Sequence, residues 1–179
     1  MRIVAGKYRH RLIEYPDDAS HIRPTKDRIR EALFSSLGNL EGLTVLDLYA
    51  GSGAMGIEAL SRGADKCVFV DISPLANKVI KKNISNLGIT NYELLYTSDF
   101  NALEMFKEKG YKFDLVILDP PYKSEDYTKV IEYLINNELC TPHARIVTEC
   151  NHALDFSMIK VERNKEYHYG EIRLNVLYL

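Results

Sequence analysis

Four consecutive residues, Asp119-Pro120-Pro121-Tyr122, place a carboxylate, two rigid prolines and an aromatic ring directly after an apolar run. This set suits the activation of a planar amino nitrogen, a poor nucleophile because its lone pair is delocalised into a ring. If the Asp119 carboxylate and the Pro120 carbonyl accept its two N–H groups, the nitrogen becomes tetrahedral, and Asp119 offsets its positive charge or takes its proton. The prolines stiffen the loop, and Tyr122 offers a flat face for stacking a base. The segment predicts catalysis, and a rigid turn at a strand exit is the alternative interpretation.

The hexapeptide 51–56 (GSGAMG) fits the pattern G-x-G-x-x-G between a predicted strand and a predicted helix. Glycines at these positions permit a tight turn, close approach of the backbone to a ligand and close helix packing. Asp71 follows Gly51 by twenty residues, at the end of the next predicted strand, where its carboxylate can accept both hydroxyls of a ribose. Together these features favour a nucleotide-like ligand over a turn that binds nothing. The expected contacts are Gly51, Ser52, Gly53, Asp71 and Ile72.

Four carboxylates, those of Asp47, Asp71, Asp99 and Asp119, lie at or just beyond the predicted carboxyl ends of strands. In a doubly wound sheet that edge forms the ligand crevice. Acidic groups there would repel a pyrophosphate but attract the sulfonium and ammonium groups of S-adenosylmethionine, which we therefore expect in place of a nicotinamide cofactor. Asp47 would lie near the methionine end, Asp71 on the ribose and Asp99 near the adenine amino group, with Phe100 packed on the adenine ring. For Asp47 and Asp99, capping of the following turn is an equally good interpretation.

Apolar segments of strand length alternate along the chain with segments of helical periodicity. The predicted strands are 44–48, 66–71, 92–96, 113–118 and 144–149, and the predicted helices are 25–37, 54–62, 74–87, one after Asp99, and 125–136. Residues 158–166 and 171–179 are expected to form a terminal antiparallel pair. Apolar strands alternating with helices predict an α/β fold with a parallel sheet covered on both faces. Arg23 and Thr25, where the first helix opens, are placed to approach the carboxylate of the cofactor, although capping explains Thr25 equally well.

The N-terminal residues are expected to form a basic hairpin, with short strands at 3–5 and 11–13 and a turn near Gly6. The first thirteen residues contain four basic side chains and no acidic one, which is typical of a contact with a phosphate backbone. Lys7, Arg9 and Arg11 are the candidates for that contact. A strand edge kept charged to discourage aggregation is the alternative.

The 179 residues suffice for one α/β domain but not for two of ordinary size. A net charge of −2 excludes a basic coat over the whole surface, though not a local patch. The three cysteines of the chain form no C-x-x-C pair, so we expect reduced thiols and a cytoplasmic location. The five histidines lack metal-ligand spacing, so we expect no metal site. The N-terminus lacks the apolar core of a signal peptide, and no stretch approaches the length of a membrane span.

The chain resembles the bacterial 16S ribosomal RNA guanine-N2 methyltransferases of the RsmD type. Segments 2–6, 23–34, 45–64, 119–122 and 169–171 carry the resemblance. Many methyltransferases share the glycine loop, whereas the opening Arg-Ile-Val-Ala-Gly and the Arg-Pro-Thr helix entry are more specific. The expected fold is a Rossmann-like class I methyltransferase, with a seven-stranded, mostly parallel sheet, an antiparallel C-terminal strand and a small N-terminal β-hairpin. We expect one domain, with residues 1–20 as the hairpin extension and 21–179 as the core.

The resemblance implies methyl transfer from S-adenosylmethionine to the exocyclic N2 of one guanine in 16S rRNA, within the RNA or an assembling small subunit. It also implies that the hairpin helps to hold RNA, so we expect Lys7, Arg9 and Arg11, together with Pro121 and Tyr122, to contact it. A monomer is the expected oligomeric state. Two positions depart from the family pattern: His10 stands where glycine is common, and Tyr49 where phenylalanine is frequent, with a hydroxyl expected simply to face water.

Other functions fit parts of the same pattern. The catalytic loop could present an adenine amine, which would make the protein an adenine-N6 methyltransferase of nucleic acid. A non-catalytic RNA-binding assembly factor would use the pocket only for sensing, but the intact Asp119 and Tyr122 argue against it. A nicotinamide oxidoreductase is disfavoured by the acidic crevice.

Overall fold

The computed structural model describes residues 1–16, 27–120 and 127–179. Seven strands form one sheet in the order β3-β2-β1-β4-β5-β7-β6. The strands are β1 (Thr44–Leu48), β2 (Lys66–Asp71), β3 (Tyr92–Tyr96), β4 (Phe113–Leu118), β5 (Cys140–Cys150), β6 (Arg163–Tyr169) and β7 (Ile172–Tyr178). The helices are α1 (Asp27–Leu37), α2 (Ala54–Ser61), α3 (Pro74–Leu87), α4 (Asp99–Lys109) and α5 (Tyr127–Asn136). These elements confirm the predicted α/β fold.

Strands β1 to β5 are parallel, whereas β7 runs antiparallel to β5 and β6 antiparallel to β7. The strand order reverses between β1 and β4, because the chain leaves β1 towards β2 and β3 and returns on the other side of β1. In open α/β sheets, ligands bind outside the carboxyl ends of the strands at such a switch point. The topology therefore points to the loops that follow β1 and β4.

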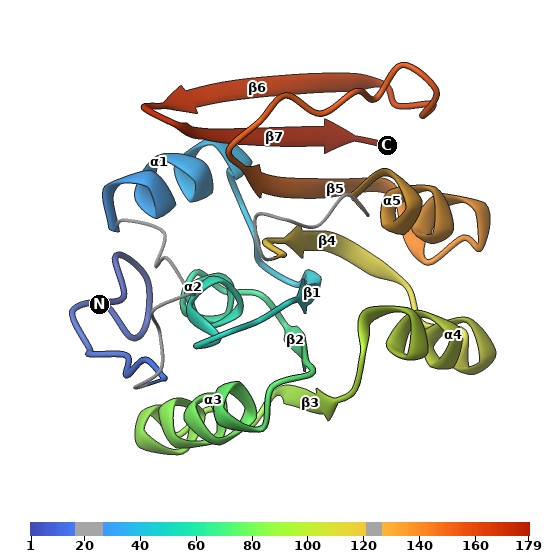
Figure 1. The fold of residues 1–179 in the computed structure, drawn as a ribbon. Helices are drawn as coiled ribbons and strands as arrows, with labels where there is room; N and C mark the ends of the chain where they lie inside the picture. The colour runs from blue at the N-terminus through green and yellow to red at the C-terminus, as the bar shows by residue number, and fades with distance from the viewer. Residues whose placement is uncertain (17–26, 121–126) are drawn as a thin grey trace.

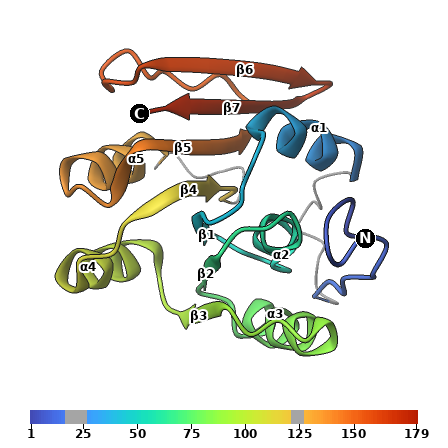
Figure 2. The same cartoon turned by 180° about the vertical axis from the view of Figure 1, so that it is seen from behind.

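Successive residues of the buried strands serve two cores, because side chains alternate between the two faces of a sheet. One core combines Val45, Ile117 and Val147 with the apolar faces of α1, α2 and α3. The opposite core combines strand residues such as Leu46 and Leu118 with α4 and α5. Figures 1 and 2 show the two groups of helices on opposite sides of the sheet. Burial on both faces explains why the sequences of these strands are apolar throughout.

Helix α3 shows how local sequence sets an element's ends. The Ser73 side chain accepts a hydrogen bond from the Ala76 N–H, Pro74 occupies the first turn, and Gly88 ends the helix with φ 66°. These are the expected capping signals at each end of a helix. The predicted bounds of α3 are confirmed.

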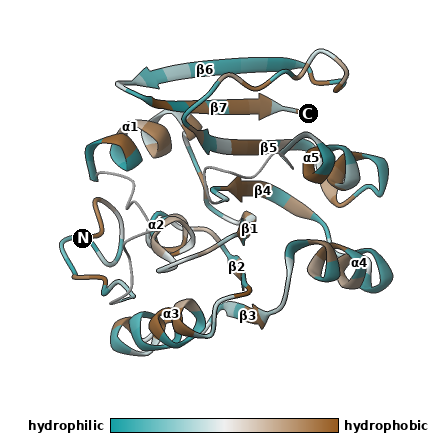
Figure 3. Cartoon of the chain, in the orientation of Figure 1, coloured by the Kyte–Doolittle hydropathy of each residue, from teal (hydrophilic) through white to brown (hydrophobic). Residues whose placement is uncertain are grey.

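Two predicted strands differ in extent from the observed ones. The segment expected at 158–166 begins as a strand only at Arg163, because Arg163 pairs with Tyr178, the last residue of β7, and residues before it lie beyond that partner. Met158 is accordingly 88% exposed. Strand β5, expected at 144–149, already begins at Cys140, because an irregularity in the register of β4 lets Phe113 pair with Cys140. Figure 3 shows β6, the edge strand, as more hydrophilic than its neighbour β7.

The N-terminal segment forms the predicted antiparallel pair, reduced to one bridge between Arg2 and Leu12. The Ile3 N–H donates to the Arg11 carbonyl (3.0 Å), and the His10 N–H donates to the Ile3 carbonyl (2.9 Å). Ile3 and Ile13 are buried in the core under α1 to α3, so this hairpin is part of the domain's packing. The predicted division at residues 20 and 21 lies outside the described residues.

Candidate active site

The turn between β1 and α2 reverses the chain through left-handed backbone conformations. Tyr49, Gly51 and Gly53 have φ values of 76°, 56° and 78°. The Tyr49 and Ala50 N–H groups both donate to the Val70 carbonyl at 3.0 Å, which fixes the start of the turn against β2. Glycine adopts this conformation without steric cost, whereas Tyr49 adopts it with backbone strain. The predicted glycine turn is therefore present, next to the switch point.

Asp47 lies inside the domain, with only 2% of its surface exposed. Its Oδ2 accepts a hydrogen bond from the Gly56 N–H at 2.8 Å, and so ties α2 to β1. Burial, with a smaller contribution from Asp71, raises the pKa of Asp47 to about 7. Of the two interpretations offered by the sequence, the structure shows the carboxylate bonded to the segment after the turn. Contact between Asp47 and a methionine group stays a prediction.

Asp71 is held by the glycine turn itself. Its Oδ2 accepts from the Gly51 N–H at 2.7 Å, and its Oδ1 accepts from the Ser73 N–H at 2.8 Å. A carboxylate has about four lone-pair positions, so two backbone bonds fix its orientation and leave acceptors for two further hydroxyls. These free acceptor positions fit the two hydroxyl donors of a ribose. The neighbouring Ile72 is 66% exposed.

Asp99 and Phe100 begin α4 at the same edge of the sheet. The Tyr49 hydroxyl donates to Asp99 Oδ2 at 2.6 Å, and the Phe100 N–H donates to Asp99 Oδ1 at 2.8 Å. The expectation that the Tyr49 hydroxyl faces water was wrong, because the left-handed turn at Tyr49 brings its ring to α4. Phe100 is 36% exposed and makes an edge contact with Tyr133, with 6.1 Å between the ring centroids. One face of the site thus offers a partly exposed aromatic ring beside a carboxylate.

Ser52 is nearly buried and contacts the rest of the protein through its backbone. Its carbonyl accepts from Asn83 Nδ2 on α3 at 3.0 Å. The same amide group donates to the Glu14 carbonyl at 3.0 Å, and Asn83 Oδ1 accepts from the Glu14 N–H at 2.9 Å. Asn83 therefore joins the N-terminal segment to the glycine turn. This role of Asn83 was not predicted, because a single asparagine in a helix carries no signal of a long-range contact.

The predicted catalytic carboxylate, Asp119, directly follows β4. Leu48 and Leu118 are register partners in β1 and β4, so the glycine turn and the Asp119-Pro120 segment leave the sheet side by side. Asp119 is partly buried and Pro120 is buried. Burial raises the pKa of Asp119 well above its ordinary value, and the negative charges of Glu149 and Asp47 raise it further. Such a carboxylate holds a proton more readily than one in water.

Four other predicted site residues lie outside the described residues. These are Arg23 and Thr25, expected at the cofactor carboxylate, and Pro121 and Tyr122, expected at the RNA. Their assigned roles stay predictions.

The basic hairpin is clamped to α2 by the buried carboxylate of Glu58. Glu58 Oε2 accepts from the Val4 N–H at 2.9 Å, and Oε1 accepts from the Ala5 N–H at 3.1 Å. The same carboxylate pairs with Arg30 Nε at 3.3 Å and with Arg62 Nε at 2.8 Å. The sequence offered no sign of this arrangement, because Glu58 stands in an ordinary helical pattern.

Ser61, one turn further along α2, completes the clamp. Its carbonyl accepts from the Lys7 N–H at 2.7 Å, and its hydroxyl accepts from the Tyr8 N–H at 2.9 Å. Gly6 approaches so closely that a Cβ there would lie 1.7 Å from the Ser61 carbonyl oxygen. Figure 1 shows the N-terminal segment beside α2, between α1 and α3. The backbone of residues 4–8 is therefore fixed against α2.

Lys7, Arg9 and Arg11 are all exposed, as expected for a surface that binds a polyanion. They are not equivalent, however. The Arg11 guanidinium donates to the Asn86 carbonyl on α3 at 2.9 Å, and the Lys7 ammonium lies 5.2 Å from the centre of the Tyr8 ring. Arg9, at the tip, is bound through its backbone N–H to the Gly6 carbonyl. His10 adopts φ 68°, a left-handed conformation that glycine would adopt without strain.

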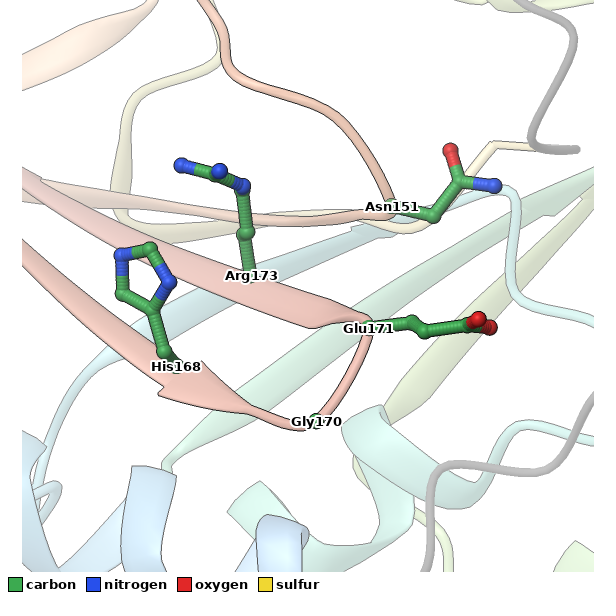
Figure 4. Close-up of a pocket in the computed structure, with 5 residues that line it drawn as sticks. All are labelled: Asn151, His168, Gly170, Glu171 and Arg173. Atoms are coloured by element: carbon green, nitrogen blue, oxygen red, sulfur yellow. The ribbon is translucent and has the colours of Figure 1, made fainter.

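A polar hollow of about 330 Å³ lies where the β6–β7 turn meets the end of β5. Its lining, drawn in Figure 4, consists of Asn151, His168, Gly170, Glu171 and Arg173. The Arg173 guanidinium donates to Glu166 Oε1 at 3.1 Å, so part of its charge is offset within β6 and β7. Strands β5 and β6 end at this edge of the sheet, the same edge at which β4 ends.

Among residues 1–16, 27–120 and 127–179, no group of three or more His, Cys, Asp or Glu side chains is arranged to hold a metal ion. In the same ranges, no helix combines the length and the apolar character needed to span a membrane.

Comparison with known proteins gives the same picture as the geometry. The family model described as conserved hypothetical protein 95 matches residues 1–178. The ribosomal RNA small subunit methyltransferase D of Buchnera aphidicola (subspecies Baizongia pistaciae) is 31% identical over 180 residues, covering 95% of this chain and 90% of its own. The chain belongs to this methyltransferase family. The enzyme of the same name from Escherichia coli K12 is 33% identical over 150 residues, covering 83% of this chain and 74% of its own.

The fold agrees with this membership. A solved structure of an Escherichia coli protein described as a candidate methyltransferase, yhhF, superposes with a TM-score of 0.86 at 28% identity. It covers 99% of this chain and 97% of its own. The sequence-based expectations of the RsmD family and of a Rossmann-like methyltransferase fold are confirmed, and S-adenosylmethionine is the methyl donor consistent with both.

Proposed function

We propose that this protein transfers a methyl group from S-adenosylmethionine to the exocyclic N2 of a guanine in the RNA of the small ribosomal subunit. The observation that carries the proposal is the emergence of the glycine turn and of Asp119 from neighbouring strands at the switch point. Adjacent strands are about 4.8 Å apart, so a donor bound at the turn and an amine bound at Asp119 meet. The choice of guanine as the base, and of N2 as the methylated atom, rests on the resemblance to the guanine-N2 methyltransferases.

Ten residues would hold the cofactor: Arg23, Thr25, Asp47, Gly51, Ser52, Gly53, Asp71, Ile72, Asp99 and Phe100. The fixed Asp71 carboxylate would accept the ribose hydroxyls, and the exposed ring of Phe100 would pack against the adenine. Asp99 would accept from the adenine amine through lone pairs that the Tyr49 hydroxyl and the Phe100 N–H leave over. Asp47 acts on the methionine end, and Arg23 and Thr25 on its carboxylate. When bound, the cofactor supplies an electrophilic methyl group on a positively charged sulfur.

The chain's own residues then act on the amine. The Asp119 carboxylate and the Pro120 carbonyl accept the two N–H groups, which lets the nitrogen become tetrahedral and turns its lone pair towards the methyl carbon. As the C–N bond forms and the C–S bond breaks, the nitrogen becomes positive and loses one proton to Asp119. The raised pKa of Asp119 suits it to receive that proton. Tyr122 would stack on the extruded base and Pro121 would hold the loop rigid.

RNA would lie across the hairpin and the carboxyl edge of the sheet. Lys7 and Arg9 present their charges from a backbone fixed by Ser61, and Arg11 shares its charge with the Asn86 carbonyl. Each phosphate contact contributes to the salt dependence of binding. The double variant Arg9→Ala, Arg11→Ala should therefore bind RNA more weakly, with a shallower dependence on salt. An unchanged slope would refute these contacts.

The partner is 16S rRNA or the assembling small subunit, and the protein acts as a monomer in the cytoplasm. Size-exclusion chromatography with light scattering tests the oligomeric state.

The reaction itself is tested with labelled S-adenosylmethionine and small-subunit particles that lack the modification. Mapping the labelled nucleoside separates N2-methylguanine from N6-methyladenine. Asp119→Ala should abolish transfer while calorimetry still detects donor binding, and the exposed Asp155→Ala serves as a matched control that keeps both. Equal turnover by Asp119→Ala and the wild type would refute the role of Asp119, and binding of RNA without transfer by the wild type would favour an assembly factor.

A further inference from the structure

A second carboxylate, that of Glu149, lies beside Asp119 in the sheet. Leu118 of β4 is the register partner of Thr148 of β5, so the next residues along the two parallel strands are Asp119 and Glu149. We propose that Glu149 is a positioning residue that makes Asp119 a stronger acceptor for the proton released by the amine. The inference rests on the proposed methyl transfer and adds to it a group that touches neither substrate nor cofactor.

The two carboxylates share one face of the sheet. Ile117 and Val147 are register partners and both belong to the core under α1 to α3. Side chains two residues apart on a strand point to the same side, so Asp119 and Glu149 also face that side. Glu149 is 2% exposed, and little water screens its charge from its neighbour.

The backbone around Glu149 is fixed from two directions. Its carbonyl accepts from the Tyr127 hydroxyl of α5 at 2.6 Å. Its own register partner in β7 is Leu174, while the preceding Thr148 receives the Asn175 amide at 3.3 Å. These bonds hold the backbone that carries the Glu149 carboxylate in one place.

Among the described residues, two charges act on Asp119, and both are negative. Glu149 contributes more than Asp47, which faces the same side from β1 and is itself buried. Leu174 of β7 is the register partner of Glu149, and Tyr167 of β6 is the register partner of Leu174. Both side chains are uncharged and belong to or pack against the core on this side. Helix α2 carries Glu58, whose charge is paired with Arg30 and Arg62. Within the described residues, Glu149 is therefore the main electrostatic reason, after burial, for the raised pKa of Asp119.

When the C–N bond forms and the C–S bond breaks, the proton passes from nitrogen to an oxygen of Asp119, and later to water. A negative neighbour favours the protonated form of Asp119, so Glu149 favours this transfer without forming or breaking a bond itself.

The test is Glu149→Gln, which removes the charge and keeps the shape. The carboxyl ¹³C resonance of Asp119, assigned by its loss in Asp119→Asn, reports the titration of that group in the protein without substrate. Removal of a neighbouring like charge lowers the titration midpoint of a carboxyl group by about 1 pH unit or more. We expect this decrease in the Asp119 midpoint in Glu149→Gln. The acid limb of the pH profile of single-turnover methyl transfer should move to lower pH by the same amount. The KM for S-adenosylmethionine should be unchanged. Glu166→Gln, on the edge strand β6, is the control that should leave the midpoint in place.

Glu149→Asp keeps the charge and should keep the Asp119 midpoint near that of the wild type. It separates the charge of residue 149 from its packing, and it remains informative if Glu149→Gln folds poorly. An Asp119 midpoint that does not fall in Glu149→Gln, or that falls equally in Glu149→Asp, would overturn the inference. A wild-type protein that transfers no methyl group would instead overturn the proposed function, because the titration requires no reaction.

Discussion

Replacement of Glu58 by alanine tests whether the basic hairpin is a rigid part of the domain. The Glu58 carboxylate is fully buried and receives the Val4 and Ala5 N–H groups together with the side chains of Arg30 and Arg62. Alanine removes all four interactions at once. The N-terminal segment would then be held by Ser61, by the bonds to Asn83 and Asn86 on α3, and by its buried isoleucines.

The expected loss of stability follows from the buried Arg30 charge that the substitution leaves without one of its partners. Arg30 is completely buried, and truncating one partner of a buried ion pair costs about 3–5 kcal/mol. Arg30 keeps Asp27, at 3.2 Å, as a second partner, so the lower end applies. We therefore expect the free energy of unfolding to fall by about 3 kcal/mol. A typical domain is stable by 5–15 kcal/mol, so the variant should still fold.

Urea unfolding followed by far-ultraviolet circular dichroism measures this loss, since the chain has no tryptophan to report it. Glu14→Ala is the matched control. Its carboxylate also pairs with one basic side chain, Lys82, at 2.7 Å, but both side chains are about half exposed, with relative exposures of 59% and 48%. Exposed pairs contribute about 0–1 kcal/mol, so the control should change little.

Hydrogen exchange separates local release of the hairpin from global loss of stability. In Glu58→Ala, the Val4 and Ala5 amides should exchange much faster than amides of the central strands, and RNA affinity should fall with the loss of a fixed hairpin. Equal stability of the Glu58 and Glu14 variants, or unchanged protection of the two amides, would refute the clamp.

Three further predictions concern single positions. His10→Gly should stabilise the protein by about 0.5 kcal/mol in urea, because relief of left-handed strain exceeds the entropy that glycine adds to the unfolded chain; a loss of stability would contradict this. Gly56→Ala should destabilise it by about 1–3 kcal/mol, because the new Cβ would lie 2.3 Å from the Phe69 ring, and an unchanged melting temperature would count against that packing. Asp47 has a pKa near 7 in the folded protein and near 3.8 when unfolded, so its contribution to stability is present below about pH 4 and is lost as the pH rises to 7. Asp47→Asn should flatten the dependence of stability on pH across this window, and a slope equal to that of the wild type would disprove the buried titration.

Much of the fold could be predicted from the sequence because its signals are local. Ser73, Pro74 and Gly88 are within a few bonds of the backbone groups that they cap, and helix α3 has the predicted bounds. Apolar residues at every position of a strand require cover on both faces, which gave the α/β class. The glycine turn and Asp119 follow their strands directly, and parallel pairing of β1 with β4 then brings them together.

Errors appeared where a partner decided the outcome. The strand expected from residue 158 begins at Arg163 because its antiparallel partner ends at Tyr178. The Tyr49 hydroxyl was expected in water but reaches Asp99, fifty residues further along the chain. In both cases the local sequence is compatible with either result, and the neighbouring element chooses between them.

The sequence by itself determined which residues can do chemistry: a carboxylate and carbonyl able to accept from an amine, a glycine turn, and a basic N-terminal segment. Only the tertiary structure decided what surrounds them. It fixed the hairpin on Glu58 and placed Glu149 beside Asp119, across separations of about 54 and 30 residues. The physical reason is that capping and periodicity act within one element, whereas burial and the interaction of charges depend on which elements the fold brings into contact.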